Sequence, residues 1–138
     1  MSEKTFKLEV ITPDRVVISA DDVTSVVAPG VEGYLGVLAN HSPLMTALKI
    51  GRLNFKRADG SVKEMAISGG FMEVHNNTVT VLAEAAEQAD EIDLERAERA
   101  AKRAEERLST RDKNIDIERA KAALQRALNR LEVARRAS

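Results

Sequence analysis

Residues 83–108 have the sequence AEAAEQADEIDLERAERAAKRAEERL, and the composition of the chain changes abruptly within them. All seven glycines of the 138-residue chain lie at or before Gly70, and all three prolines lie at or before Pro43. After Glu87, by contrast, 24 of the 51 residues are charged and 11 are alanine. Alanine, arginine, glutamate and lysine favour helices. The sequence therefore predicts two units, a turn-rich one over residues 1–87 and a helical one over residues 88–138.

The first unit is predicted to consist of short strands joined by turns. Phe6, Leu8 and Val10 alternate with other side chains, as expected for a strand with one buried face. Asp59-Gly60 and Asn76-Asn77 each separate two β-branched runs, which is a hairpin signal. Eight to ten short strands without an intervening helix pattern favour an antiparallel sandwich or barrel over βαβ units.

The second unit is predicted to form two helices. Apolar residues follow steps of three and four over residues 94–108 and again over residues 117–131. Residues 109–112, with the sequence STRD, interrupt the pattern, and Asp93 is placed to cap the first helix. Because short connections favour antiparallel neighbours, we expect a two-helix hairpin and an α+β chain overall.

The predicted hairpin is thin and internally repetitive. Residues 92–97 (IDLERA) recur as residues 115–120 (IDIERA), so that each copy opens a helix. The apolar stripes are rich in alanine, which buries little area. Two short helices of this kind cannot build a strong core alone. The hairpin should therefore depend on a third surface, namely its own sandwich, a partner or a ligand, and is a candidate two-state element.

Composition excludes several classes of function. The chain has no cysteine, two histidines and a formal net charge of −1. Thiolate chemistry, a disulfide framework and a multi-histidine metal centre are therefore ruled out, and there is no overall bias toward nucleic acid. Apolar runs are too short to span a bilayer and no signal-peptide core opens the chain, so we expect a soluble intracellular protein. The isolated histidines and serines form no catalytic motif.

One group of charged residues suggests a ligand site. Asp93 and Arg96 lie in the first turn of the first helix, whereas Arg126 and Arg130 lie one turn apart in the second. In an antiparallel hairpin, both arginines are expected to converge on the Asp93/Arg96 end. Two guanidiniums at this spacing can hold phosphates, and the alternative is a set of ion pairs across the hairpin.

Four ordered stretches carry a resemblance to a known family. They are residues 10–14 (VITPD), residues 33–38 (GYLGVL) followed by His41, residues 67–74 (ISGGFMEV) and residues 79–84 (VTVLAE). With these motifs, nearly the whole chain closely resembles the epsilon subunit of bacterial F-type ATP synthases. The resemblance implies an all-β sandwich over residues 1–87 and a regulatory helical hairpin over residues 88–138.

The resemblance also implies a function and partners. The chain would be a non-catalytic rotor subunit of a proton-translocating F-type ATP synthase, with the sandwich on the central stalk against the gamma subunit and the c-ring. Folded down, the hairpin would pack on the sandwich. Extended, it would reach the catalytic alpha and beta subunits and oppose ATP hydrolysis. The protein would lie at the cytoplasmic face of the cell membrane, peripherally and through the complex only. A stand-alone helical-hairpin adaptor is the alternative, but it leaves the sandwich motifs unexplained.

Site residues follow from the same resemblance. Some family members clasp ATP, as a regulatory ligand and not as a required cofactor, through an I/L-D-x-x-R-A motif and arginines of the second helix. The matching positions here are Glu87, Ile92, Asp93, Arg96, Ala97, Arg103, Arg126 and Arg130. No metal site is implied. Expected contacts with the c-ring and stalk are Glu32, Tyr34 and His41, although Tyr34 stands where an acidic or polar residue is common.

Overall fold

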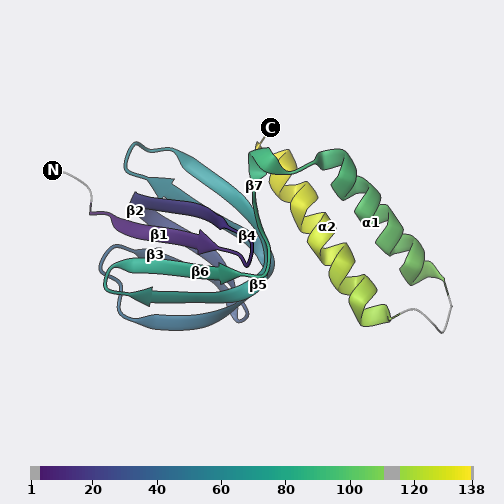
Figure 1. Ribbon diagram of the computed structural model, residues 1–138, viewed down its shortest axis with the longest axis horizontal. Coiled ribbons are helices and arrows are strands. Elements are labelled where there is room, and N and C mark those ends of the chain that lie inside the picture. The colour runs from purple at the N-terminus through teal and green to yellow at the C-terminus, as the bar shows by residue number, and fades with distance from the viewer. Residues whose placement is uncertain (1–3, 111–115, 138) are drawn as a thin grey trace.

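The computed structural model describes residues 4–110 and 116–137, which form a strand-rich unit followed by two helices (Figure 1). The strands are β1 (Phe6–Ile11), β2 (Val16–Gly30), β3 (Gly33–Leu38), β4 (Leu44–Arg57), β5 (Val62–His75), β6 (Thr78–Ala83) and β7 (Ala86–Gln88). A 3-10 turn, η1 (Ala89–Glu91), leads to helices α1 (Leu94–Ser109) and α2 (Ile117–Ala137). The predicted fold class, a β-sandwich followed by an antiparallel helical hairpin, is confirmed.

Two details of the predicted organisation need qualification. The boundary expected after Glu87 falls inside β7, because this short strand pairs with β5 and extends the sandwich to Gln88. The predicted interruption at Arg111 and Asp112 lies outside the described residues, as does Ile115 of the second repeat.

The expected number of strands is wrong. The described residues form seven strands, because β2 and β5 are each long enough to replace two short ones. At Asp21 and Asp22, β2 changes partner from β1 to β4, and Arg57 of β4 binds the Asp22 carboxylate at 2.9 Å. β5 continues through Gly70, where φ is +130° and a Cβ would lie 2.1 Å from the Leu82 carbonyl oxygen. Only glycine fits there without a shift of the backbone.

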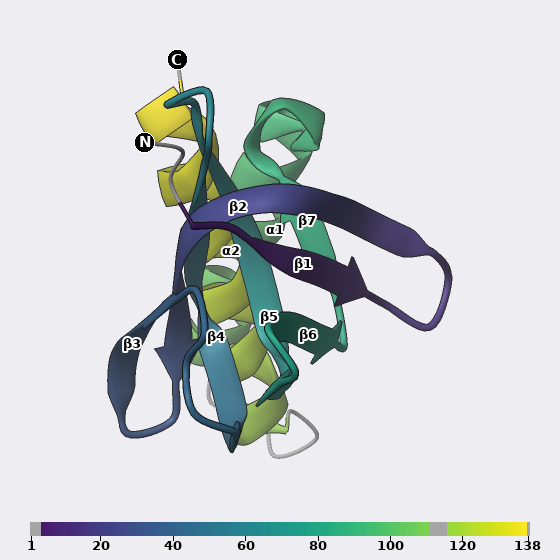
Figure 2. The ribbon, with the colours of Figure 1, turned by 90° about the vertical axis from the view of Figure 1, so that its left-hand side faces the viewer.

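The strands are ordered β1-β6-β5-β4-β2-β3, with β7 on β5, and an additional pairing between β1 and β2 closes the sheet on itself (Figure 2). Because β2, β4 and β5 are long, each contributes to both layers of the sandwich. All pairings are antiparallel except that of β1 with β6, which no local turn predicts because these strands are distant in sequence. The core lies between the layers, and its largest fully buried side chains are Phe55, Leu8, Leu53, Met65, Ile67 and Met72.

The hairpin lies beside one layer of the sandwich. α2 contacts β4, β5 and η1, and α1 lies on the far side of α2 (Figure 1). Each helix begins with the aspartate of its repeat: the backbone N–H of Arg96 donates to Asp93 Oδ1 and that of Arg119 donates to Asp116 Oδ1, both at 3.1 Å. The predicted cap at Asp93 is thereby confirmed. Neither α1 nor α2 combines the length and the apolar composition that a membrane crossing requires.

Candidate functional site

The contact between α2 and the sandwich is largely polar. Asn129 Nδ2 of α2 donates to the carbonyl oxygen of Gly51 at 2.8 Å, and Glu132 of α2 pairs with Arg52 at 3.6 Å. Gly51 and Arg52 are neighbours on β4. One turn further on, Arg136 Nε donates to Glu64 of β5 at 3.0 Å. Residues 129, 132 and 136 share one face of a helix, and this face is the one that the sandwich holds.

Apolar packing at the same face is small. Val133 lies between Asn129 and Arg136 on the helix surface and is fully buried, although it belongs to neither of the two hydrophobic clusters of the chain. Sequence reasoning did not find this docking face. The sequence signal for the docking face was a row of polar residues on the side of α2 away from the alanine stripe. Such a row does not show whether solvent or another part of the protein covers that side.

The two helices pack through small residues in a fixed register. Ala97 and Ala101 of α1 form a cluster with Ala127 and Leu131 of α2. Beside this cluster, Arg135 of α2 pairs with Glu98 of α1 at 3.4 Å. The small side chains and this ion pair set which residues of the two helices lie at the same level.

This register bears on one prediction. In an antiparallel pair, the alanine cluster places Ala97 at the level of Leu131 and Ala101 at the level of Ala127. Arg130 then lies about 3 Å along the axis from the level of Arg96 and about 8 Å from that of Asp93, whereas Arg126 lies one turn further away, near the level of Arg103. Arg130 is thus close to the Asp93/Arg96 end, and the convergence of both arginines on that end stays a prediction.

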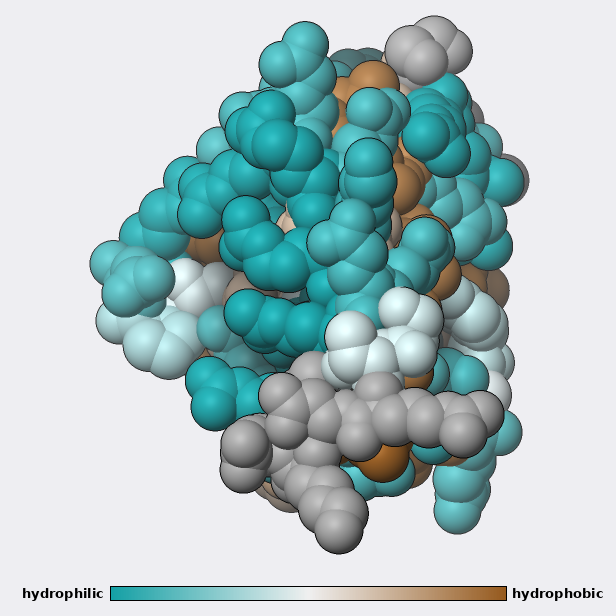
Figure 3. All heavy atoms as spheres, turned by 90° about the vertical axis from the view of Figure 1, so that its right-hand side faces the viewer, coloured by the Kyte–Doolittle hydropathy of each residue, from teal (hydrophilic) through white to brown (hydrophobic). Residues whose placement is uncertain are grey.

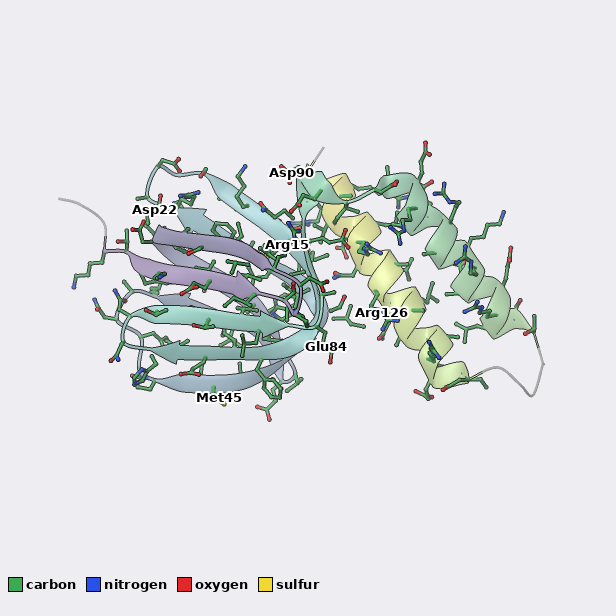
Figure 4. All side chains as sticks on the ribbon, in the orientation of Figure 1. Arg15, Asp22, Met45, Glu84, Asp90 and Arg126 are labelled. Atoms are coloured by element: carbon green, nitrogen blue, oxygen red, sulfur yellow. The ribbon has the colours of Figure 1, made fainter. Side chains whose placement is uncertain are left out.

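Four predicted ligand residues nevertheless share one side of the hairpin. Five residues rotate a helix by about 140°, so Arg103 and Arg130 both lie on the side opposite the Glu98–Arg135 pair. Arg96 is two turns from Arg103, and Arg126 is one turn from Arg130 (Figure 4 labels Arg126 on α2). We call this set, Arg96, Arg103, Arg126 and Arg130, the arginine side.

Three of these four side chains have no ionic partner among residues 4–110 and 116–137, namely Arg96, Arg103 and Arg126. Arg130 forms an ion pair with Glu87 of β7, so the structure brings two of the predicted ligand residues into direct contact. Arg130 Nε is buried and lacks a hydrogen-bond acceptor within the described part of the chain. The arginine side therefore has unused donors and excess positive charge, which suit a polyanion.

The remaining ligand candidates have structural roles. Asp93 caps α1, Ile92 precedes it in the link from η1, and Ala97 is buried in the interhelical cluster. The described part of the second repeat has the same geometry, because Asp116 caps α2 and Ala120 is buried. The I-D-x-x-R-A pattern thus specifies the start of a packed helix, and in the first copy it also places Arg96 on the arginine side.

Figure 3 shows that the side of the molecule that carries the helices is mainly hydrophilic, with some apolar surface between the charged side chains. The exposed large apolar residues of the hairpin include Leu94, Ile117 and Leu128. No group of three or more histidine, aspartate or glutamate side chains suited to a metal ion occurs among the described residues.

The predicted contacts with the c-ring and stalk do not form one cluster. Glu32 lies in the turn between β2 and β3 and Tyr34 lies near the start of β3, whereas His41 follows its far end. The loop around His41 lies beside the turn between β5 and β6, since the backbone N–H of Asn40 donates to Asn77 Oδ1 at 2.8 Å. These residues can therefore contribute to partner contacts only at opposite ends of β3.

Tyr34 faces the hairpin. With Arg52, Leu128 and Glu132, it lines a cleft of about 650 Å³ between the sandwich and α2. Its hydroxyl accepts a hydrogen bond from the backbone N–H of Arg52 at 3.3 Å. A side-chain hydrogen bond to Tyr34 is also the main reason that the pKa of Arg52 is raised above its ordinary value, and Glu132 adds to this effect.

An exposed apolar stripe crosses the other layer of the sandwich. Phe71 of β5 lies opposite Leu82 of β6 and Ala47 of β4, and Ile11 of β1 lies opposite Leu82. Phe71 is 57% exposed and Leu82 is 55% exposed. We call these four residues the apolar stripe. Carboxylates border the apolar stripe. Sequence reasoning did not identify the stripe, although apolar residues on both faces of one strand were a signal for it.

A sandwich that carries a docked helical hairpin on one layer and an exposed apolar stripe on the other has the architecture of a binding subunit. The chain belongs to the ATP synthase delta/epsilon chain family. Residues 5–89 match the family model described as the delta/epsilon chain beta-sandwich domain, and residues 90–135 match the one described as its long alpha-helix domain. The family assignment expected from the sequence motifs is confirmed.

Relatives and solved structures agree with this assignment. The chain is 56% identical to an ATP synthase epsilon chain of Pelotomaculum thermopropionicum over 109 residues, which cover 79% of this chain and 80% of the relative. It is 54% identical to one of Carboxydothermus hydrogenoformans over 111 residues, covering 80% and 81%. A chain in the mitochondrial ATP synthase of Euglena gracilis, solved as OSCP, F1 and c-ring, has a TM-score of 0.81 at 26% identity and covers 97% of this chain and 83% of that one.

Proposed function

We propose that this epsilon-type, non-catalytic chain is a rotor subunit of a proton-translocating F-type ATP synthase. In this role the sandwich, residues 1–87, binds the gamma subunit and the c-ring, and so couples the catalytic head to the membrane ring. The subunit then lies at the cytoplasmic face of the cell membrane and reaches the membrane only through the complex. Glu32, Tyr34 and His41 are the proposed contacts with the c-ring and stalk.

We assign the apolar stripe to gamma. An exposed aromatic residue flanked by aliphatic ones, with polar residues around it, is the usual centre of a protein interface. Of the two bordering carboxylates, Glu9 pairs with Lys7, whereas Glu73 has no ionic partner among the described residues. Glu73 therefore favours a basic residue at the rim of the partner surface. α2 occupies the other layer, so a subunit bound at the stripe leaves the hairpin free to move.

The hairpin, residues 88–138, is the proposed regulatory arm. The observation that supports this role is the character of its docking face, which consists of separate polar contacts with little apolar packing. Exposed ion pairs contribute little to stability individually, so the docked state can be given up for another partner. In the extended state, the arm contacts the alpha and beta subunits and opposes ATP hydrolysis.

ATP is the proposed regulatory ligand of the docked hairpin. The unpaired donors of the arginine side fit a triphosphate, and the buried Arg130 Nε fits a further acceptor. Arg126 and Arg130 bind the phosphates from α2, and Arg96 and Arg103 add charge from α1. Glu87 orients Arg130. Because the ligand contacts both helices and the Glu87 side of the sandwich, it favours the docked state by its differential affinity.

A stand-alone adaptor is not favoured, because the family match covers the sandwich as well as the hairpin. Binding to gamma tests the rotor role. Replacing Phe71 with aspartate places a charge at the centre of the stripe and should weaken binding of the full chain to isolated gamma by about 30-fold or more. Calorimetry on the two purified subunits measures this change.

Val62→Asp is the matched control for this substitution. Val62 is a 63% exposed apolar residue on β5 but lies outside the stripe, near Arg136 and the end of α2. Its substitution should leave the affinity for gamma unchanged. Equal affinities of wild type and Phe71→Asp would show that gamma does not bind the stripe.

A further inference from the structure

Tyr34 reaches across the sandwich from an edge strand to the docking face. Among the described residues β3 pairs only with β2, and Tyr34 lies opposite Pro29 in this pairing. The side chain passes over β2 to β4, because a Cβ built on Gly51 would lie 2.5 Å from Pro29 Cβ and 3.2 Å from the Tyr34 hydroxyl oxygen. The Tyr34 hydroxyl can therefore occupy this position because Gly51 has no side chain.

At that place Tyr34 contacts the two residues of β4 that hold α2. Its hydroxyl oxygen lies over Gly51, whose carbonyl oxygen accepts the hydrogen bond from Asn129. The same oxygen accepts the backbone N–H of Arg52, whose guanidinium pairs with Glu132. One hydroxyl thus holds the backbone of Gly51 and Arg52, the two residues of β4 to which α2 is attached.

We propose that Tyr34 is a positioning residue for the docked hairpin, acting through Arg52 on Glu132. This role deepens the proposed regulatory function of the hairpin and rests on it. It also accounts for tyrosine at a position where the resemblance led us to expect an acidic or polar residue. Tyr34 remains 50% exposed beside the β2–β3 turn. A partner bound at this turn and the docked hairpin would therefore contact the same side chain.

A buried thiol measures docking in the isolated full chain. The protein has no cysteine, so Val133→Cys introduces a single thiol that reagents reach only when α2 leaves the sandwich. Tyr34→Phe, which removes only the hydroxyl, should raise the labelling rate about threefold to tenfold, the value of one hydrogen bond. Each rate is compared with that of the same variant in denaturant.

Two further measurements separate positioning from general stabilisation. Glu132→Gln should raise the rate similarly, and Tyr34→Phe should add little on top of it, because both act through one contact. In a chain with Val79→Cys, a thiol in the sandwich core, Tyr34→Phe should leave labelling unchanged. An unchanged rate at residue 133, full additivity with Glu132→Gln, or an equal rise at residue 79 would each overturn the proposal. None of these outcomes involves gamma or hydrolysis, so the rotor and regulatory roles are tested separately.

Discussion

Removing the hairpin should raise the rate of ATP hydrolysis by the assembled catalytic complex about fivefold or more. This value is the lower end of the effects that one site usually has on another through allosteric coupling. The physical reason is that only the hairpin can move from the sandwich into the catalytic subunits, since its docking rests on separable polar contacts. The chain should be cut after Glu91, which retains β7, η1 and the ion pair between Arg15 and Glu91. Steady-state hydrolysis by the reconstituted complex measures the effect.

Incorporation of the shortened chain must be measured alongside. The apolar stripe lies on β1, β4, β5 and β6, so the truncation should leave the affinity for gamma unchanged. With equal incorporation, unchanged hydrolysis would contradict the regulatory role of the hairpin while leaving the rotor role intact.

Replacing Arg126 with alanine should lower the affinity of the isolated full chain for ATP about tenfold or more, the value of a charge-assisted hydrogen bond. Arg126 is the cleaner of the two α2 variants, because Arg130→Ala also leaves Glu87 without its partner. Both should lose affinity without unfolding the sandwich, since neither side chain lies in its core. Calorimetric titration with ATP measures the two affinities.

Lys102→Ala is the control with the same loss of charge. Lys102 is exposed on α1, one turn from Glu98 and therefore on the side of the hairpin opposite the arginine side. The Lys102→Ala variant should bind ATP with the same affinity as the unaltered chain. No heat of binding at millimolar ATP, or equal losses in Lys102→Ala and Arg126→Ala, would rule out a phosphate clamp at the arginine side.

Features determined by neighbouring residues were predictable from sequence. The change of composition at Glu87, the cap at Asp93 and the alanine stripes all depend on local preference or helical period, and the structure contains each of them. The grouping of Arg126 with Arg130 is likewise a consequence of the helical period. Such signals predict the two-helix arm and an antiparallel sandwich or barrel, and the family resemblance selects the sandwich.

Features that depend on distant partners were not predictable. The register of the hairpin, which places Arg130 nearer than Arg126 to the Asp93/Arg96 end, is set by interhelical packing. β2 continues through Asp22 as its pairing passes from β1 to β4, two strands that lie far from this position in the sequence. The role of Tyr34 on the docking face requires the bare backbone of Gly51 on a strand that is not its neighbour.

The central claim is that the docked hairpin is the non-inhibiting state of the arm, and fixing it there tests this directly. Glu64 and Arg136 lie in contact across the docking face, and the chain has no other cysteines, so Glu64→Cys with Arg136→Cys can be joined by a short bismaleimide. Complexes that contain the crosslinked chain should hydrolyse ATP as fast as those that lack the hairpin, whereas each single variant treated alike should remain inhibited. A crosslinked complex that stays as inhibited as the untreated one would contradict the account.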